Sequence, residues 1–288
     1  MAIIKQLTLI GVGLIGGSLA RALRASGQVQ EVIGFGRNLA NLHQAVDLGV
    51  VDRIETSMAR AVRGADMLVL AVPVGAMAQV LGDIAPHISD QTVITDVGSV
   101  KGSVVAAARA ALGVHFHHFV PAHPLAGSEK SGVTASVEAL FRGQRVILTP
   151  VAETDGGALT RVEHMWRATG AETVTLSVEE HDAILAATSH LPHLLAFSLI
   201  DVLAREPATR RVFDFIGNGF RDMTRIAASD PVMWRDIGLA NRTAILQALG
   251  DYRADLDALI AALEHSDAVY LEAFFTRARQ ARQGIDPK

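Results

Sequence analysis

The hydrophobic residues of the first 176 positions fall into short runs separated by amphipathic stretches. Several runs are continuously apolar, as is typical of strands buried on both faces of a sheet. The expected strands are residues 6–11, 31–36, 66–73, 92–97, 117–123, 145–150 and 172–176. Helical periodicity between the early runs, as in GGSLARALRASG, predicts a mostly parallel sheet with helices on both faces.

The pattern changes after Ser177, where the strand-like runs stop. Residues 177–206 predict a helix with Ser177 as N-cap and Glu180 at the capping-box position, and Pro192 should kink or break it. Asp230 is a suitable N-cap and Pro231 would occupy the first helical position, so a second helix is predicted to begin there. The rest of the chain is almost wholly helical in pattern. We therefore predict an α/β domain over residues 1–177 and an all-α domain over residues 178–288.

A glycine pattern follows the first strand-like run and opens a helical one. In Gly11-x-Gly13-x-x-Gly16, the first glycine permits a tight turn, the second a close approach of backbone to a pyrophosphate, and the third close packing of helix on strand. The helix N-terminus then offers unpaired N–H groups to the phosphates. The pattern predicts a Rossmann-type site that holds the cofactor with Gly11, Gly13, Leu14, Ile15 and Gly16. A strand–turn–helix without ligand is the alternative.

The second strand-like run ends in GFGRN, where an acidic residue often holds the ribose of NAD. Gly36 removes the repulsion that such an acid would exert on a 2′-phosphate. Arg37 could pair with that phosphate through two parallel N–H bonds, and Asn38 could add a donor. We expect NADP rather than NAD. In the alternative, Arg37 is a solvated surface residue and NAD binds in a looser ribose site.

Composition and charge exclude several classes of protein. The 288 residues are 50% hydrophobic and 19% charged, which is a globular composition with room for two domains. The net charge of −4 gives no sign of a nucleic-acid partner. Cysteine is absent, so disulfides and thiol catalysis are excluded and a cytoplasmic location is allowed. We expect no membrane association, because the apolar stretch 191–204 is short and holds His193 and Asp201.

The apolar N-terminal run could pass for a signal peptide. It follows a single charged residue, Lys5, and carries glycines at informative spacings. We therefore do not expect it to be a secretory signal.

Polar residues follow two later strands, at the edge where open α/β sheets bind ligands. Ser99 lies in a turn after residues 92–97, and His123 ends the run 117–123. The histidines in HFHH, residues 115–118, lack further ligands at a convincing spacing, so no metal is expected.

The helical half carries its own polar residues. His190 and His193 lie three positions apart, and His190 is expected to be a satisfied core histidine. Arg225 by itself could equally form a surface ion pair with Asp222.

Five segments together resemble the prephenate/arogenate (cyclohexadienyl) dehydrogenase family of tyrosine biosynthesis. They are GVGLIGGSLA, DVGSVK, HPLAGSEKSG, SHLPH and GFRDMTRIAASDPVMWRDI, and they span about residues 7 to 240 in order. The resemblance implies an N-terminal nucleotide-binding domain and a C-terminal helical dimerisation domain, and hence a homodimer. The Gly36-Arg37 pair departs from the pattern of common members of this family, which speaks against NAD as the cofactor.

The resemblance implies two catalytic residues and a further cofactor contact. The family's catalytic histidine matches His123, which would accept a hydrogen bond from the substrate's ring hydroxyl and draw its proton away. Ser99 would hydrogen-bond near that hydroxyl and the nicotinamide. Val72, in the AVP turn, would lie along the cofactor.

The resemblance also implies three substrate-binding residues. His193 would contact the substrate, and Arg225 would bind a substrate carboxylate, that of the ring. Glu129 would lie in a loop that gates the pocket.

The implied activity is the NAD(P)-dependent oxidative decarboxylation of prephenate to 4-hydroxyphenylpyruvate, of arogenate to tyrosine, or of both. Three alternatives stay open. One is another two-domain NADP oxidoreductase of the imine or 3-hydroxy-acid type, for which we would expect a catalytic lysine or a different helical motif. Another is an NADP-binding sensor without turnover. The last is a structural helical protein with a vestigial nucleotide fold, against which the polar pocket argues.

Overall fold

The computed structural model describes residues 4–127, 130–205 and 207–285. Spatial contacts divide the chain into two compact units, residues 1–242 and 243–288. The predicted division after residue 177 falls inside the first unit and stays a prediction.

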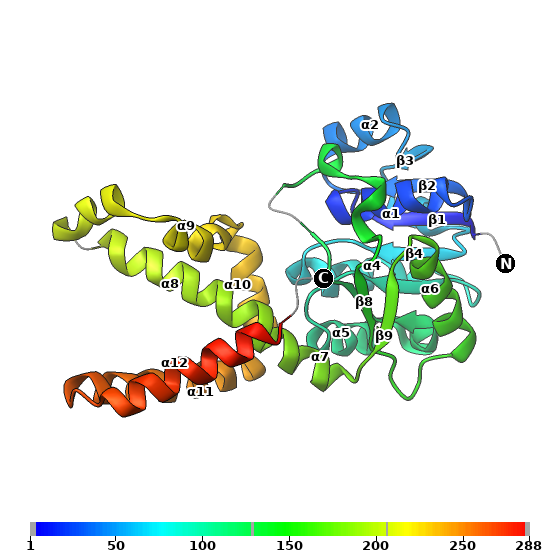
Figure 1. Ribbon diagram of the computed structural model, residues 1–288. Helices are drawn as coiled ribbons and strands as arrows, with labels where there is room; N and C mark the ends of the chain where they lie inside the picture. Colours follow the sequence, from blue (N-terminus) through cyan, green and yellow to red (C-terminus); the bar gives the residue numbers. More distant parts are fainter. Residues whose placement is uncertain (1–3, 128–129, 206, 286–288) are drawn as a thin grey trace. The chain divides into compact units, whose positions relative to one another are not determined.

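A six-stranded parallel sheet forms the centre of the first unit (Figure 1). Its strands lie in the order β3-β2-β1-β4-β5-β6. Their bounds are β1 (Ile4–Ile10), β2 (Val29–Phe35), β3 (Arg53–Glu55), β4 (Met67–Leu70), β5 (Val93–Asp96) and β6 (Phe119–Val120). This is the strand order of a dinucleotide-binding α/β fold, in which ligands lie at the carboxyl ends of the strands near the β1/β4 switch point.

Both faces of this sheet are covered, because alternate residues of its central strands belong to two different hydrophobic clusters. Leu9 and Val69 pack in the cluster that contains Trp166, whereas Leu70 packs in the cluster that contains Met77. The helices of this part are α1 (Leu14–Ala25), α2 (Leu39–Asp47), α3 (Met58–Val62), α4 (Met77–Ile84), α5 (Gly102–Leu112) and α6 (Gly156–Ala168). The predicted fold class, an α/β sheet followed by helices, is confirmed.

The predicted strand over residues 117–123 was wrong as a single element. A 3₁₀ turn ends at His118, β6 follows in the large sheet, and β7 (Ala122–Pro124) belongs to a second sheet. Pro121 lies between β6 and β7 and has no N–H to donate to either ladder, and the chain leaves the large sheet there. In the second sheet β7 is antiparallel to β8 (Arg145–Leu148), which is parallel to β9 (Glu172–Thr175).

Helices follow β9, beginning at the predicted cap. The Ser177 hydroxyl accepts from the Glu180 N–H while the Glu180 carboxylate accepts from the Ser177 N–H, so the capping box is confirmed. The helices are α7 (Val178–Leu185), α8 (Leu191–Arg205), α9 (Asn218–Thr224) and α10 (Pro231–Ala240). A π-helical turn, Ala186–His190, joins α7 to α8 just before Pro192, so the proline disturbs the helix without ending it. The Asp230 carboxylate caps α10, as predicted.

Residues Val178–Arg205 form one helical run of 28 residues. Its most apolar window of 18 residues has a mean hydropathy of 1.5. By length and composition alone such a helix could cross a membrane, because the apolar stretch 191–204 counts together with the helix on its N-terminal side. Signal sequences and core helices meet the same criterion, so one such run is weak evidence. The expectation of no membrane association stays a prediction.

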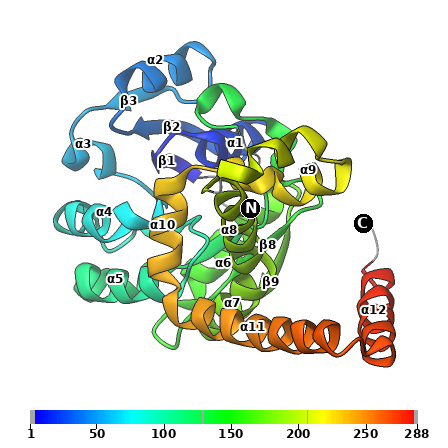
Figure 2. The same cartoon turned by 90° about the vertical axis from the view of Figure 1, so that its left-hand side faces the viewer.

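The second unit consists of two helices, α11 (Arg242–Glu264) and α12 (Ala268–Gln283), which Figure 2 shows in succession. Large apolar side chains are exposed on both; they are Leu246, Tyr252, Leu256, Ile260, Leu263, Val269 and Phe275. Four of them, from Tyr252 to Leu263, follow at helical spacing and form one apolar stripe along α11.

Short 3₁₀ turns connect these elements. They are Val74–Ala76, Ala85–His87, Gly113–His118, Val133–Ala135, Glu138–Phe141, Pro207–Phe215 and Arg225–Ala228.

Candidate active site

The glycine loop joins β1 to α1 and is packed too tightly for side chains at two of its three glycines. Gly11 has φ +101°, and a Cβ there would lie 2.3 Å from the Ala71 carbonyl oxygen. A Cβ at Gly16 would lie 2.4 Å from the Gly11 carbonyl oxygen. A Cβ at Gly13 would meet no described atom within 4 Å, so that glycine leaves space in front of the helix. The loop therefore fits a dinucleotide pyrophosphate.

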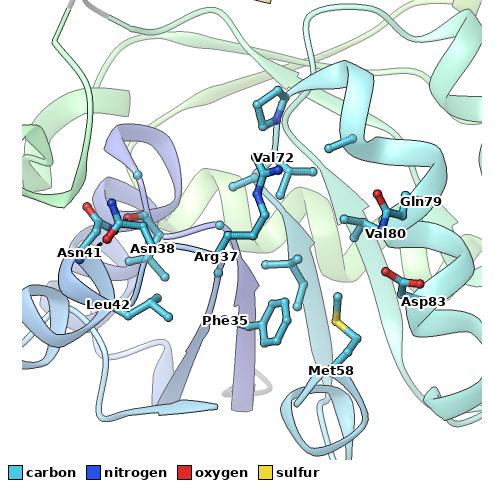
Figure 3. A pocket seen from close by; sticks show the side chains of 18 of the residues that line it. Phe35, Arg37, Asn38, Asn41, Leu42, Met58, Val72, Gln79, Val80 and Asp83 are labelled. Atoms are coloured by element: carbon cyan, nitrogen blue, oxygen red, sulfur yellow. Dashed lines mark hydrogen bonds between the residues drawn. The ribbon is translucent and has the colours of Figure 1, made fainter. Parts of the chain in front are cut away.

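A cavity of about 470 Å³ opens beside this loop at the end of β2 (Figure 3). Five of the predicted cofactor residues line it, namely Gly11, Gly13, Arg37, Asn38 and Val72. The wall opposite β2 is formed by α3 and α4. It was not predicted, because these two helices carry no recognisable cofactor-binding motif. The residues of that wall include Met58, Gln79, Val80 and Asp83.

Arg37 extends into this cavity in Figure 3, and Asp83 lines the same cavity. No described carboxylate lies within 4.0 Å of the Arg37 guanidinium. The fold itself does not require glycine at position 36, because a Cβ there would make only ordinary contacts with Leu42 at 3.7 Å or more. Asn38 uses its Oδ1 to cap α2 by accepting from the Asn41 N–H, which leaves its amide NH₂ for a ligand.

A larger cavity of about 850 Å³ lies on the other side of the glycine loop. It brings together the loop residues Gly13 to Gly16 with Ser99 and His123, two residues predicted to be catalytic. Its far wall comes from the helical segment, through side chains that include Met233 and Asp236. One continuous space thus connects the phosphate loop with the predicted base.

His123 lies on β7 and is buried apart from the side that reaches this cavity. Burial, and then the positive charge of Lys101, lower its pKa well below 6.5. His181 and His190 act in the same direction. The imidazole is therefore neutral at neutral pH and able to accept a proton.

The other face of His123 is joined to two residues of α7 that sequence reasoning missed. His123 Nδ1 lies 2.9 Å from His181 Nε2, and His181 Nδ1 lies 2.8 Å from Asp182 Oδ1. The Asp182 carboxylate also accepts from the backbone N–H groups of Lys101 and Gly102, each at 2.8 Å. No motif or spacing could have paired His123 with His181, because they are 58 residues apart.

A buried ion pair fixes the turn that carries Ser99. The Lys101 ammonium is wholly buried and donates to the Asp96 carboxylate and, at 2.7 Å, to the Ala122 carbonyl oxygen. Asp96 accepts in addition from the Gly98 N–H at 2.8 Å. Because Asp96 ends β5 and Ala122 opens β7, this pair ties the Ser99 turn to the strand that bears His123.

The predicted substrate-binding residues of the helical segment lie near one another but do not line the two cavities. The His193 imidazole stacks on Trp234 and donates Nδ1–H to the Ser189 carbonyl oxygen at 2.9 Å. Burial lowers the pKa of His193, and the positive charge of Arg225 adds to the effect. Arg225 is exposed and makes no ion pair with Asp222 or any other described carboxylate, so its role in binding substrate stays a prediction. Glu129 lies outside the described residues.

His190 is a core histidine, as expected, but only one of its nitrogens has a partner. It is fully buried, and its Nδ1 accepts from the Asn241 amide at 3.1 Å. Its Nε2 has no hydrogen-bond partner among the described residues.

The histidines of HFHH do not assemble into a metal site. In the described part of the chain, no three His, Cys, Asp or Glu side chains are grouped as ligands would be. The expectation of no metal stays a prediction.

Comparison with known proteins places this site in a family. The model of the prephenate dehydrogenase nucleotide-binding domain matches residues 19–175, and that of its dimerization domain matches residues 177–277. The cyclohexadienyl dehydrogenase of Zymomonas mobilis is 38% identical over 287 residues, which cover 99% of this chain and 97% of that protein.

Two solved structures have the same fold over nearly their whole length. Prephenate dehydrogenase from Aquifex aeolicus, in complex with hydroxyphenyl propionate and NAD⁺, is 35% identical with a TM-score of 0.92, and the match covers 98% of this chain and 99% of that one. Arogenate dehydrogenase from Synechocystis is 27% identical with a TM-score of 0.83, and the match covers 98% and 100%.

These likenesses confirm the resemblance carried by the five sequence segments. The family models cover the Ser99 turn, His123 and the helical segment with His193 and Arg225, and the alignment with the Zymomonas enzyme extends over the glycine loop as well. The chain belongs to the prephenate dehydrogenase family, the oxidoreductases of tyrosine biosynthesis that join a nucleotide-binding domain to a dimerisation domain.

Proposed function

We propose that this protein catalyses the NADP-dependent oxidative decarboxylation of prephenate, arogenate or both. The observation that carries the proposal is the cavity that His123 and Ser99 share with the glycine loop. The relatives named for prephenate, arogenate and cyclohexadienyl substrates support the substrate class.

His123 is the proposed base. The substrate is a cyclohexadiene with a hydroxyl and a carboxylate on opposite ring carbons, and loss of hydride from the hydroxyl-bearing carbon builds positive charge there. His123 relieves that charge by accepting the hydroxyl proton, for which its neutral imidazole is suited. Ser99 hydrogen-bonds near the hydroxyl. A nicotinamide bound beyond the glycine loop supplies the hydride acceptor.

The ring carboxylate leaves as CO₂ once the hydride and the proton have gone, and the ring becomes aromatic. Aromatisation makes the step effectively irreversible, so no electrophile is needed to stabilise an enolate. Arg225 holds this carboxylate in place and His193 contacts the substrate, as positioning groups beside the base. Glu129 keeps its proposed place in the gating loop.

The choice of NADP rests on the end of β2. Arg37 lines the cavity with no described carboxylate within 4.0 Å of its guanidinium, and Asn38, the N-cap of α2, follows it in the chain. A guanidinium and a helix N-terminus together favour a phosphate. Gly36 leaves room where an acidic side chain would repel that phosphate. NAD is the alternative, and the Aquifex relative is described with NAD⁺.

We propose that the enzyme is a cytoplasmic homodimer whose helical domain starts at residue 178. The dimerization-domain match over residues 177–277 and the apolar stripe of α11 support this assembly. A charge in that stripe, Ile260→Asp, should weaken self-association about 30-fold or more, which light scattering after gel filtration would detect. Unchanged dimers would move the interface elsewhere.

The deciding experiment for the function is an assay of both substrates against both cofactors, followed by the absorbance of the reduced nicotinamide. The proposal expects turnover with at least one substrate and a higher kcat/KM with NADP than with NAD. No turnover in any of the four combinations would favour a non-catalytic NADP-binding protein. Turnover of an imine or a 3-hydroxy acid instead would favour the other two-domain oxidoreductases.

A further inference from the structure

We propose that His181 and Asp182 are positioning residues that hold His123 with its proton on Nδ1 and with Nε2 bare toward the cavity. The inference rests on the proposed role of His123 as proton acceptor. The contacts that carry it are His123 Nδ1 to His181 Nε2 at 2.9 Å, and His181 Nδ1 to Asp182 Oδ1 at 2.8 Å.

The direction of these two hydrogen bonds follows from the ionised carboxylate at the end of the chain. Burial by itself would raise the pKa of Asp182, but hydrogen bonds from His181 and from the Lys101 and Gly102 backbone outweigh it and lower the pKa. An ionised carboxylate only accepts, so the proton of His181 lies on Nδ1. With a single proton on His181, its other nitrogen, Nε2, accepts, and His123 donates from Nδ1. The bare nitrogen of His123 is therefore Nε2.

The hydrogen-bonded chain His123–His181–Asp182, called the relay below, is anchored to fixed parts of the fold. Asp182 accepts two backbone N–H groups at the N-terminus of α5, which is a favourable place for a carboxylate. Its own carbonyl oxygen accepts from the Asn241 amide at 2.9 Å. His181 is fully buried, so water does not compete for its nitrogens. A fixed acceptor behind a base selects one tautomer of that base.

The relay also balances the charge that the reaction leaves on His123. The substrate O–H bond breaks, and an N–H bond forms at His123 Nε2. The resulting imidazolium still donates Nδ1–H to His181, whose other side faces the Asp182 carboxylate. Lys101, His181 and His190 all act to lower the pKa of His123, so positive charge on any of them opposes the imidazolium. The hydrogen bond to His181 Nε2, with the Asp182 carboxylate behind it, is the contact that offsets this opposition.

Two variants of His181 separate positioning from packing. In His181→Gln the amide oxygen takes the place of Nε2 and still accepts from His123, whereas His181→Leu offers no acceptor. The Leu variant should lose about 10- to 100-fold in kcat with little change in substrate KM, and the Gln variant should recover about tenfold of that loss. The control is His164→Gln on the exposed side of α6, which should keep wild-type kcat.

The pH profile gives a readout that packing alone does not move. Without the acceptor, the imidazolium of His123 loses its stabilisation, and the acid limb of kcat should move to lower pH in the Leu variant. The Gln variant should stay closer to wild type. A Leu variant with wild-type kcat and an unmoved acid limb would overturn the proposal.

The tautomer can be read without turnover, which protects the test from a variant that does not fold. In the intact protein labelled with ¹⁵N-histidine, above the titration range, His123 should show a protonated Nδ1 and an unprotonated Nε2. His123→Asn identifies the signals. Protonated Nε2 in the wild type would overturn the inference even if the enzyme is active. If neither substrate is oxidised, the proposed function fails, while the spectrum still decides the tautomer.

Discussion

Trp234 lies flat against the imidazole of His193, with ring centroids 3.9 Å apart and planes inclined by 23°. The indole covers one face of the ring, and the Ser189 carbonyl oxygen occupies Nδ1–H. Only Nε2 is left to meet a ligand, and it carries no proton in the neutral ring. His193 is therefore held as an acceptor, suited to a hydroxyl or an ammonium group and unsuited to a carboxylate, which under the proposed function is bound by Arg225.

Replacing Arg225 tests this division of roles. Arg225→Ala should raise the KM for prephenate or arogenate by about 10- to 100-fold, because a charge-assisted hydrogen bond to a carboxylate is lost. The KM for the cofactor should stay the same, since Arg225 does not line the cavity beside Arg37. Arg221→Ala, one turn earlier on α9, is the control. An unchanged substrate KM would remove Arg225 from the site.

His123→Asn should lower kcat by about 10²- to 10⁴-fold with little change in KM, because the amide cannot take up the proton. Steady-state kinetics over a range of pH would show the acid limb of kcat disappear together with the activity. Near wild-type kcat in this variant would exclude His123 as the base.

Arg37→Ala should raise the KM for NADP by about 10- to 100-fold and leave that for NAD nearly unchanged, because only NADP carries the phosphate. The reverse change is Gly36→Asp, for which the fold has space. This variant should favour NAD over NADP, because the new carboxylate would repel the 2′-phosphate. The matched control is Arg63→Ala, an exposed arginine beyond the cavity. Equal effects on both cofactors would contradict the phosphate site.

His190 should make the protein less stable in acid. Burial lowers its pKa to about 4, with Asp182 opposing the shift and His181 and His193 adding to it. The unfolded chain, with an ordinary histidine pKa near 6.5, binds more protons between these values, so the free energy of unfolding falls as pH falls through this window. The loss from this one group is about 2 kcal/mol between pH 7 and pH 5.

Urea unfolding at several pH values would measure this loss. His190→Gln should show a shallower fall than wild type, and His164→Gln should follow wild type. His123 contributes in the same direction, since its pKa is also lowered, so the slope should diminish and not vanish. Identical slopes in wild type and His190→Gln would show that His190 does not titrate in this way.

The sequence predicted those parts of the fold that local chemistry decides. The glycine loop, the Ser177 capping box and the Asp230 cap each depend on residues a few positions apart. β3 was missed because Arg53–Glu55 is a strand of only 3 residues that pairs with the edge of β2 and has no apolar run of its own.

The site was predictable only where a segment carried its own signal. Ser99 and His123 stand at strand ends in recognisable segments, and the structure brings both into one cavity. The contact of His123 with His181 depends on how α7 packs beside the second sheet, a tertiary relationship that no local pattern records. For the same reason the wall formed by Met58 and Val80 was found only in the structure.

The π-helical turn between α7 and α8 sets the phase between the two histidine-bearing helices. A π-helical turn closes i→i+5 hydrogen bonds and so holds about one residue more than an α-helical turn. The extra position is taken up within Ala186–His190, and α8 keeps nearly the phase that a regular helix one residue shorter would give it relative to His181. A deletion within the regular part of α7 or α8 would instead rotate everything beyond it by about 100° and carry His193 off the face of Trp234. The π turn is thus a place where this helical run tolerates a change in length without reorienting the side chains that follow.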